Sequence, residues 1–139
     1  MLTMAILSAV TFLVVGSFHF AILSRVASRL NKSDMSAGSH HFLLLGTIGL
    51  LHVFEAAVYT VAFRLGQSWG LGGFKTDGPL TFMDVYYFSV VNYTTLGLGD
   101  IYPSGHLRFL AGIESLEGFL LLSCSASYLF AFAKQRIKD

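Results

Sequence analysis

Long apolar stretches dominate the chain and are separated by short polar segments. Residues 3–23, 41–63 and 106–133 are largely apolar, and each stretch reaches the length of about 20 residues that one helix needs to cross a bilayer. The pattern predicts three membrane-spanning helices over these ranges. Because no basic residue precedes the first stretch, it lacks the arrangement of a cleaved signal peptide, and we expect it to remain as a span.

The segment between the second and third spans has two parts of different character. Residues 64–79 hold five glycines, which predicts an exposed loop. Residues 80–93 are too apolar for such a loop and too short to cross the bilayer and return, so we expect a re-entrant helix. Pro79 and the T-x-x-D spacing of Thr81 and Asp84 predict its N-terminus, with a capping box.

The stretch TTLGLGD, residues 94–100, follows this short helix and places glycines at alternate positions. Irregular backbone at membrane depth is tolerated only where protein buries it or where it lines a water-filled cavity. Gly97 and Gly99 can adopt backbone conformations closed to other residues, so successive carbonyls can point the same way and replace water around a cation. One strand cannot surround an ion, so we expect several copies of the chain to meet on an axis.

Composition and charge agree with a membrane protein. Of the 139 residues, 54% are hydrophobic and 12% are charged, and the few basic residues form no patch for nucleic acid. Cys124, the single cysteine, excludes an intrachain disulfide, and we expect it to be a small packing residue. Six basic residues lie in 24–40 and in the C-terminal tail, against three on the other side: Arg25, Arg29, Lys32, Lys134, Arg136 and Lys138 against Arg64, Lys75 and Arg108. The positive-inside rule therefore predicts a cytoplasmic C-terminus and an outer N-terminus.

The stretch TTLGLGDIYP, residues 94–103, resembles the signature of the potassium channel pore-domain family. The resemblance covers about 41–133, as in bacterial two-helix pore channels, and gives residues 1–40 no counterpart. Together with the three apolar stretches, it implies an all-α membrane protein with three transmembrane helices, a re-entrant pore helix and a selectivity-filter loop in each chain. It further implies a homotetramer around a four-fold axis, in lipid, in a bacterial inner (plasma) membrane. The implied organisation is an extra N-terminal transmembrane helix and cytoplasmic loop (1–40) and a pore domain (41–139), with an outer helix 41–63, outer loop 64–79, pore helix 80–93, filter 94–100 and inner helix 106–133.

The same resemblance implies roles for individual residues. Leu98 stands where the family has a tyrosine, so a hydroxyl bond is lost and only packing holds the filter's width. Val91 stands where some members carry a glutamate, so a carboxyl bridge to Asp100 is not expected. The implied filter is Thr95, Leu96, Gly97, Leu98 and Gly99, with Asp100 at its outer mouth; its support is an aromatic cuff of Tyr87 and Phe88 together with Val91, Asn92, Tyr93 and Thr94; Gly118 is a hinge; Phe119, Leu122, Ala126 and Phe130 line the cavity and gate.

Ionisable residues inside the spans are a separate signal, because they are costly in a bilayer and usually functional. His52 and Glu55 on the second span have the same i,i+3 spacing as Glu114 and Glu117 on the third, at matching depths. Matched depth suggests a His52–Glu117 pair, with the other two glutamates accepting hydrogen bonds from the pore helix at Asn92, Tyr93 or Thr94. A purely stabilising role and a pH-sensing role both stay open. We expect His19 to be a packing histidine, and His40 and His41 to be interface residues and not metal ligands.

These observations predict a passive potassium-selective channel that conducts dehydrated K⁺ through the TLGLG carbonyls. A weakly selective monovalent cation channel is the nearest alternative, and a non-conducting scaffold or transporter subunit with the same pore fold is a more distant one. An enzyme is not expected, because the glutamates and histidines show no nucleophile–base order. No cofactor is expected, potassium ions are the permeant ligands, and no span is rich enough in arginine to sense voltage. The sequence does not identify the gating stimulus or a gating partner.

Overall fold

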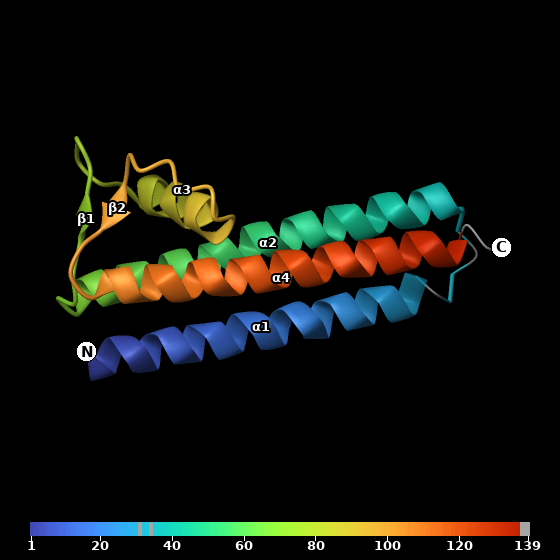
Figure 1. Cartoon of the computed structure of the whole chain (residues 1–139), viewed down its shortest axis with the longest axis horizontal. Coiled ribbons are helices and arrows are strands. Elements are labelled where there is room, and N and C mark those ends of the chain that lie inside the picture. The colour runs from blue at the N-terminus through green and yellow to red at the C-terminus, as the bar shows by residue number, and fades with distance from the viewer. Residues whose placement is uncertain (31, 34, 137–139) are drawn as a thin grey trace.

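Three long helices lie side by side, with a short helix and a two-stranded ribbon beside one end of them (Figure 1). The computed structural model describes residues 1–30, 32–33 and 35–136. Lys138, which contributes to the predicted orientation, lies outside the described residues. The elements in chain order are α1 (Leu2–Leu30), α2 (Ala37–Ser68), β1 (Phe74–Lys75), α3 (Phe82–Tyr93), β2 (Tyr102–Pro103) and α4 (Leu107–Arg136).

The three long helices are apolar and long enough to cross a membrane. Each extends beyond the apolar stretch that predicts it, because hydropathy marks only the hydrocarbon region while helical hydrogen bonds continue into the polar ends. The 32 residues of α2 reach about 48 Å, against about 30 Å of hydrocarbon. The N-terminus and the α3 region lie at one end of the bundle, and the segment between α1 and α2 lies at the other (Figure 1).

The short helix α3 begins at the capping box that the sequence predicts. The Thr81 hydroxyl accepts a hydrogen bond from the Asp84 amide at 3.2 Å, and the Asp84 carboxylate accepts one from the Thr81 amide at 2.7 Å. Thr81 also donates its hydroxyl proton to this carboxylate, and these bonds hold the pKa of Asp84 below its usual range. The box therefore satisfies two helix-end donors and places a negative charge at the positive end of the helix.

A short antiparallel pair of strands, which the sequence did not predict, joins the segment before α3 to the segment that follows residue 100. Phe74 pairs with Pro103 and Lys75 with Tyr102. The Ser104 amide also donates to the Gly73 carbonyl at 2.7 Å. A Cβ on Gly72 would collide with the Ser104 carbonyl oxygen, so this close backbone approach requires glycine. The segment predicted as an exposed loop is thus partly strand.

The bundle buries several ionisable side chains beside its apolar core and exposes apolar side chains, unlike a water-soluble domain. Buried polar side chains include His19, Glu55, Glu114 and Glu117, while many large apolar side chains of α1, α2 and α4 are exposed. This distribution suits a lipid surround, where apolar surface needs no cover and ionisable groups must face protein. The four helices share one apolar core that includes Tyr59, Phe63, Phe88, Tyr93 and Leu110.

Candidate functional site

The segment that follows α3 starts from a set of backbone hydrogen bonds at the end of the helix. The Val91 carbonyl accepts from the amides of Leu96 at 3.0 Å and Gly97 at 3.4 Å, and the Asn92 carbonyl accepts from the Thr95 amide at 3.0 Å. The chain therefore turns back across the carboxyl end of α3. Val91, whose side chain the resemblance places behind the filter, contributes its backbone carbonyl here.

Alternate residues of this segment adopt left-handed backbone angles. The φ angles are 59° at Thr95, 58° at Gly97 and 79° at Gly99. Thr95 is the one non-glycine with a positive φ among the described residues, and a β-branched residue in this region carries strain of about 1–3 kcal/mol. Strain of this kind persists only where the surroundings require it. The period of two matches the spacing of the glycines, so the sequence pattern and the backbone geometry describe the same feature.

The outer end of the segment is held by a carboxylate and a phenol. Tyr87 donates a hydrogen bond to Asp100, which raises the pKa of Tyr87 because the neutral phenol is the donor. The Asp100 carboxylate also accepts from the Ile101 amide at 3.1 Å. Phe88, its predicted companion in the aromatic cuff, instead packs in the core.

The rings that surround Phe88 belong to the outer part of the bundle. Its ring centroid lies 5.4 Å from that of Phe63 on α2 and 5.0 Å from that of Phe74 on β1. Edge-on contacts of this kind stabilise a core beyond the burial of area. Of the two cuff residues, only Tyr87 reaches the segment after α3.

A second set of hydrogen bonds joins the end of α3 to α4. The Asn92 amide donates to Glu114 at 2.6 Å and to the Ala111 carbonyl at 2.9 Å. The Ser115 hydroxyl lies 3.0 Å from both the backbone carbonyl oxygen and the side-chain Oδ1 atom of Asn92, which accept its hydrogen bond. Ser89 is in close hydrogen-bond contact with Glu114. Asn92 thus donates to Glu114, one of the contacts that the sequence predicts for this end of α3. The contacts of Ser89 and Ser115 were not predicted from the sequence.

The Ser89 hydroxyl has one proton but two oxygen neighbours. It lies 2.7 Å from the Ala56 carbonyl, which can only accept, and it also contacts Glu114. Both contacts are satisfied when Glu114 carries a proton and donates to Ser89, which then donates to Ala56. The geometry therefore favours a neutral Glu114, in agreement with its complete burial.

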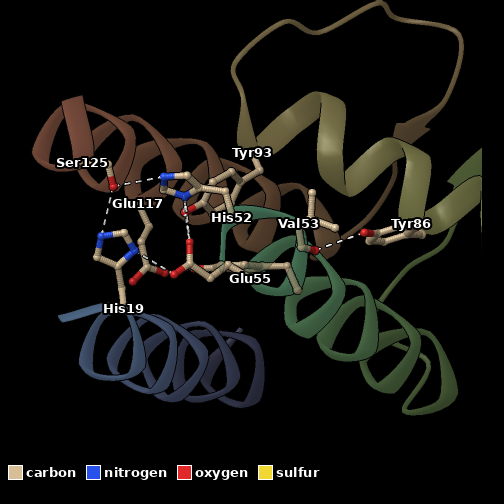
Figure 2. Close-up of polar contacts among 9 residues, drawn as sticks. His19, His52, Val53, Glu55, Tyr86, Tyr93, Glu117 and Ser125 are labelled. Carbon is tan, nitrogen blue, oxygen red and sulfur yellow. Dashed lines mark hydrogen bonds and ion pairs between the residues drawn. The ribbon is translucent and has the colours of Figure 1, made fainter. Parts of the chain in front are cut away.

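The remaining ionisable residues gather where α1, α2, α3 and α4 meet. We call His19, His52, Glu55, Tyr93 and Ser125 the buried histidine cluster (Figure 2). Glu55 accepts hydrogen bonds from the Nδ1 atom of His19 at 2.8 Å, the Nδ1 atom of His52 at 2.9 Å and the Tyr93 hydroxyl at 2.6 Å. The hydrogen bond predicted from Tyr93 to Glu55 is present.

The predicted His52–Glu117 pair is wrong. His52 binds Glu55 on its own helix, while Glu117 accepts from the Tyr59 hydroxyl at 2.5 Å. Matched depth was insufficient because it does not determine which faces of two helices meet, and His19 on the additional helix α1 is a further partner of Glu55. The i,i+3 spacing of His52 and Glu55 was the signal that pointed to the observed pair. Thr94, the third expected donor, instead bonds the backbone of α3.

The inner helix α4 presents most of its predicted stripe outward. Phe119 and Phe130 are 60% and 71% exposed, Ala126 is exposed, and Leu122 is partly buried against the core. Gly118 lies where α4 passes the end of α3, and a Cβ there would collide with the Tyr93 carbonyl oxygen. The structure thus gives Gly118 a packing role, and α4 is continuous through it. Its role as a hinge stays a prediction.

This arrangement of three apolar helices, a short capped helix and a left-handed alternating segment is that of a membrane pore domain. A model of the ion channel family matches residues 46–135, from α2 to the end of α4. The chain belongs to this ion channel family, and α1 precedes the matched region. No curated protein and no solved structure matches the chain.

Proposed function

We propose that the chain is one subunit of a homotetrameric potassium channel whose filter is residues 95–99. The observation that carries this proposal is the alternation of left-handed φ angles at Thr95, Gly97 and Gly99. A backbone that changes handedness at each residue can direct successive carbonyl oxygens to one side. Such a row of oxygens, repeated around an axis, can replace the hydration shell of K⁺.

The surface that one chain leaves uncovered supports the proposed fourfold assembly. Leu96 and Leu98 are 65% and 58% exposed in the single chain, although they belong to a segment at membrane depth in this proposal. Exposed apolar side chains also follow α3 and α4 at Met83, Phe109 and Phe119. Irregular backbone needs cover from protein or water, and copies of the same chain around an axis supply both.

The hydrogen bonds at the two ends of the segment support a potassium site of defined width. At the inner end the Val91 carbonyl holds Leu96 and Gly97, and at the outer end Tyr87 holds Asp100. The carboxyl end of α3 adds partial negative charge that favours a cation below the filter. We further propose that the α3 end of the bundle faces outward and that the membrane is a bacterial inner membrane, on the distribution of basic residues.

Leu98 decides between strict and weak selectivity. It stands between the two hydrogen-bonded ends and offers no hydroxyl to a neighbour, so its carbonyl depends on packing alone. If packing holds the width, the channel selects K⁺ over Na⁺. If it does not, the second candidate applies, a monovalent cation channel of weak selectivity.

Single-channel recording of the purified protein in opposed K⁺ and Na⁺ gradients tests the proposal. We expect a reversal potential near the potassium equilibrium potential. A reversal potential near zero would support the weakly selective channel, and the absence of current would support the non-conducting scaffold. Native mass spectrometry of the same sample should give four chains.

Two alanine variants locate the filter. Gly99→Ala places a Cβ on a residue with a φ of 79°, which costs about 1–2 kcal/mol. This variant should lose or weaken the selectivity for K⁺ over Na⁺. Gly78→Ala is the matched control, since it has an ordinary φ and open space around it, and it should conduct as the parent does. Equal currents and equal selectivity in both variants would remove residues 95–99 from the conduction path.

A further inference from the structure

Glu55, in the buried histidine cluster, and Glu117, outside it, form no ion pair with a lysine or arginine in the described part of the chain. Glu55 and Glu117 are both buried and close enough to interact electrostatically. No lysine or arginine is buried among residues 1–30, 32–33, 35–36 and 38–134. A buried carboxylate needs a compensating charge, which here must come from a proton on a histidine or from a bound cation.

Ser125 lies between the outer nitrogens of the two rings and limits where their hydrogens can be. Its hydroxyl oxygen lies 3.2 Å from the Nε2 atom of His52 and 3.3 Å from that of His19, on the side of each ring away from Glu55 (Figure 2). When both neutral rings donate from Nδ1 to Glu55, both Nε2 atoms are acceptors. One hydroxyl proton then satisfies only one of them.

A proton added to one ring removes this conflict, and so does a metal ion bound at the two Nδ1 atoms. Each neutral ring then carries its hydrogen on Nε2, and both hydrogens point at the two lone pairs of the Ser125 oxygen. Histidine ligands in metal sites almost always donate their second nitrogen to such a partner. The position of Ser125 between the two rings is therefore the outer-shell arrangement that a pair of metal-bound histidines requires.

The spacing of the inner atoms also fits a small tetrahedral ion. Ligand atoms at about 2.0–2.1 Å from a zinc ion lie roughly 3.3 Å apart. The Nδ1 atoms of His19 and His52 lie 2.8 and 2.9 Å from the Glu55 carboxylate, and one donor atom from each of the three residues falls within 4.8 Å of the others. Each Nδ1 atom therefore needs to move only a few tenths of an ångström from the carboxylate oxygen that it contacts. Tyr93, which donates to the same carboxylate at 2.6 Å, orients it.

Glu117 is a second buried carboxyl group whose polar contacts are incomplete. Its Oε1 atom is buried and has no hydrogen-bond partner in the described part of the chain. An ideal Cβ on Gly16 would lie 3.1 Å from this atom, so glycine on α1 allows the carboxyl to lie against that helix. Unpaired buried polar atoms are rare and commonly mark an ion or water.

We propose that His19, His52 and Glu55 form a binding site for a divalent transition-metal ion of the zinc class. Two imidazoles and one carboxylate are a ligand set that zinc uses in proteins, and the i,i+3 spacing of His52 and Glu55 presents two ligands on one face of α2. The expectation of no cofactor arose because the sequence did not bring His19 to the other two residues. This inference is independent of ion conduction through residues 95–99.

A bound ion has a defined structural consequence. It joins α1, which lies outside the matched family region, to α2 directly and to α3 through the hydrogen bond between Glu55 and Tyr93. Tyr93 immediately precedes the segment that begins at Thr94. Metal binding should therefore slow amide hydrogen exchange at Leu96 and Gly97, whose amides bond the end of α3.

Metal content of the full chain, purified in detergent and dialysed against Zn²⁺, tests the proposal. We expect about one zinc per chain in the parent and a loss to background in His19→Gln. His106→Gln is the matched control, because it removes an exposed imidazole outside the cluster and should keep the metal. Co²⁺ in place of Zn²⁺ should give the intense visible bands of four-coordinate cobalt in the parent and the control only.

Ser125→Ala provides a test that leaves all three ligands in place. Loss of the outer-shell acceptor should weaken Zn²⁺ binding about 10–100-fold without abolishing it. Zinc at background in the parent, or zinc and cobalt bound equally by the parent and His19→Gln, would overturn the proposal and leave a cluster held by protons alone. These measurements need no current, so they succeed or fail separately from the channel recordings.

Discussion

Replacement of Gly118 by alanine should destabilise the protein, because the end of α3 passes directly over this position. A Cβ at Gly118 would collide with the Tyr93 carbonyl oxygen and would lie 2.8 Å from the carbonyl carbon and 3.1 Å from the ring, against 3.4 Å for ordinary contact. The obstacle is mainly backbone, which cannot turn aside as a flexible side chain can. Helix α3 or α4 must therefore shift by more than half an ångström.

Two opposing terms determine the size of the effect. Overpacking of a well-packed site costs about 1–3 kcal/mol. Alanine in place of a mid-helix glycine regains about 0.5–1 kcal/mol by restricting the unfolded chain. The net loss in the free energy of unfolding is about 1–2 kcal/mol. The residue displaced is Tyr93, which donates a hydrogen bond to Glu55 and directly precedes the segment that begins at Thr94.

Thermal unfolding in detergent, followed by circular dichroism, measures this loss. Gly118→Ala should lower the midpoint by a few degrees. Gly46→Ala is the control, because this helical glycine on α2 has open space where its Cβ would lie, and its midpoint should stay or rise. A Gly118→Ala midpoint equal to or above that of the control would refute the packing role, and the hinge interpretation would then be the better account of this glycine.

Glu114→Gln should be tolerated, because the amide can donate and accept as a protonated acid does. Glu114→Ala should lower the free energy of unfolding by about 1–3 kcal/mol. Glu55→Gln should also destabilise the protein, because its amide hydrogens would face the hydrogen-bond donors His19, His52 and Tyr93. Chemical denaturation of the three variants checks that Glu114→Gln is the most stable of them. Asp84 has a lowered folded-state pKa, so its contribution to stability is complete above pH 3.8 and is lost as pH falls through the lower value. From about pH 6 to about pH 3, the thermal unfolding midpoint of the parent should therefore fall more than that of Asp84→Asn. Tyr87 has a raised folded-state pKa, so its contribution to stability is complete below pH 10.0 and is lost as pH rises through the higher value. The absorbance of its phenol, taken as the difference from Tyr87→Phe, should titrate at a lower pH in Asp100→Asn. An unchanged titration would exclude the hydrogen bond between Tyr87 and Asp100.

Features with a local cause were predictable from the sequence. The three long helices follow from uninterrupted apolar runs, since a chain in lipid must satisfy its backbone internally. The capping box of Thr81 and Asp84 needs only residues three positions apart. The left-handed angles at Gly97 and Gly99 fall at the alternate glycines that predicted unusual backbone.

Contacts between distant segments were not predictable, because depth and periodicity do not determine which faces of two helices meet. Depth suggested that His52 should pair with Glu117, yet the rotation of α1 brings His19 to Glu55 and changes the partners of the whole cluster. The strand pair of Phe74 and Pro103 joins residues that carry little strand pattern of their own.

The sequence by itself determined the class of this protein, its spans and its candidate filter, because each depends on the order of residues along a short stretch. The tertiary structure alone decided which side chains share the interior. Four helices leave one buried space at mid-height, and the side chains that enter it, His19, His52, Glu55, Tyr93 and Ser125, come from all four. Among the residues whose side chains the structure describes, no lysine or arginine is buried, so the meeting of these five side chains determines where charge must be balanced.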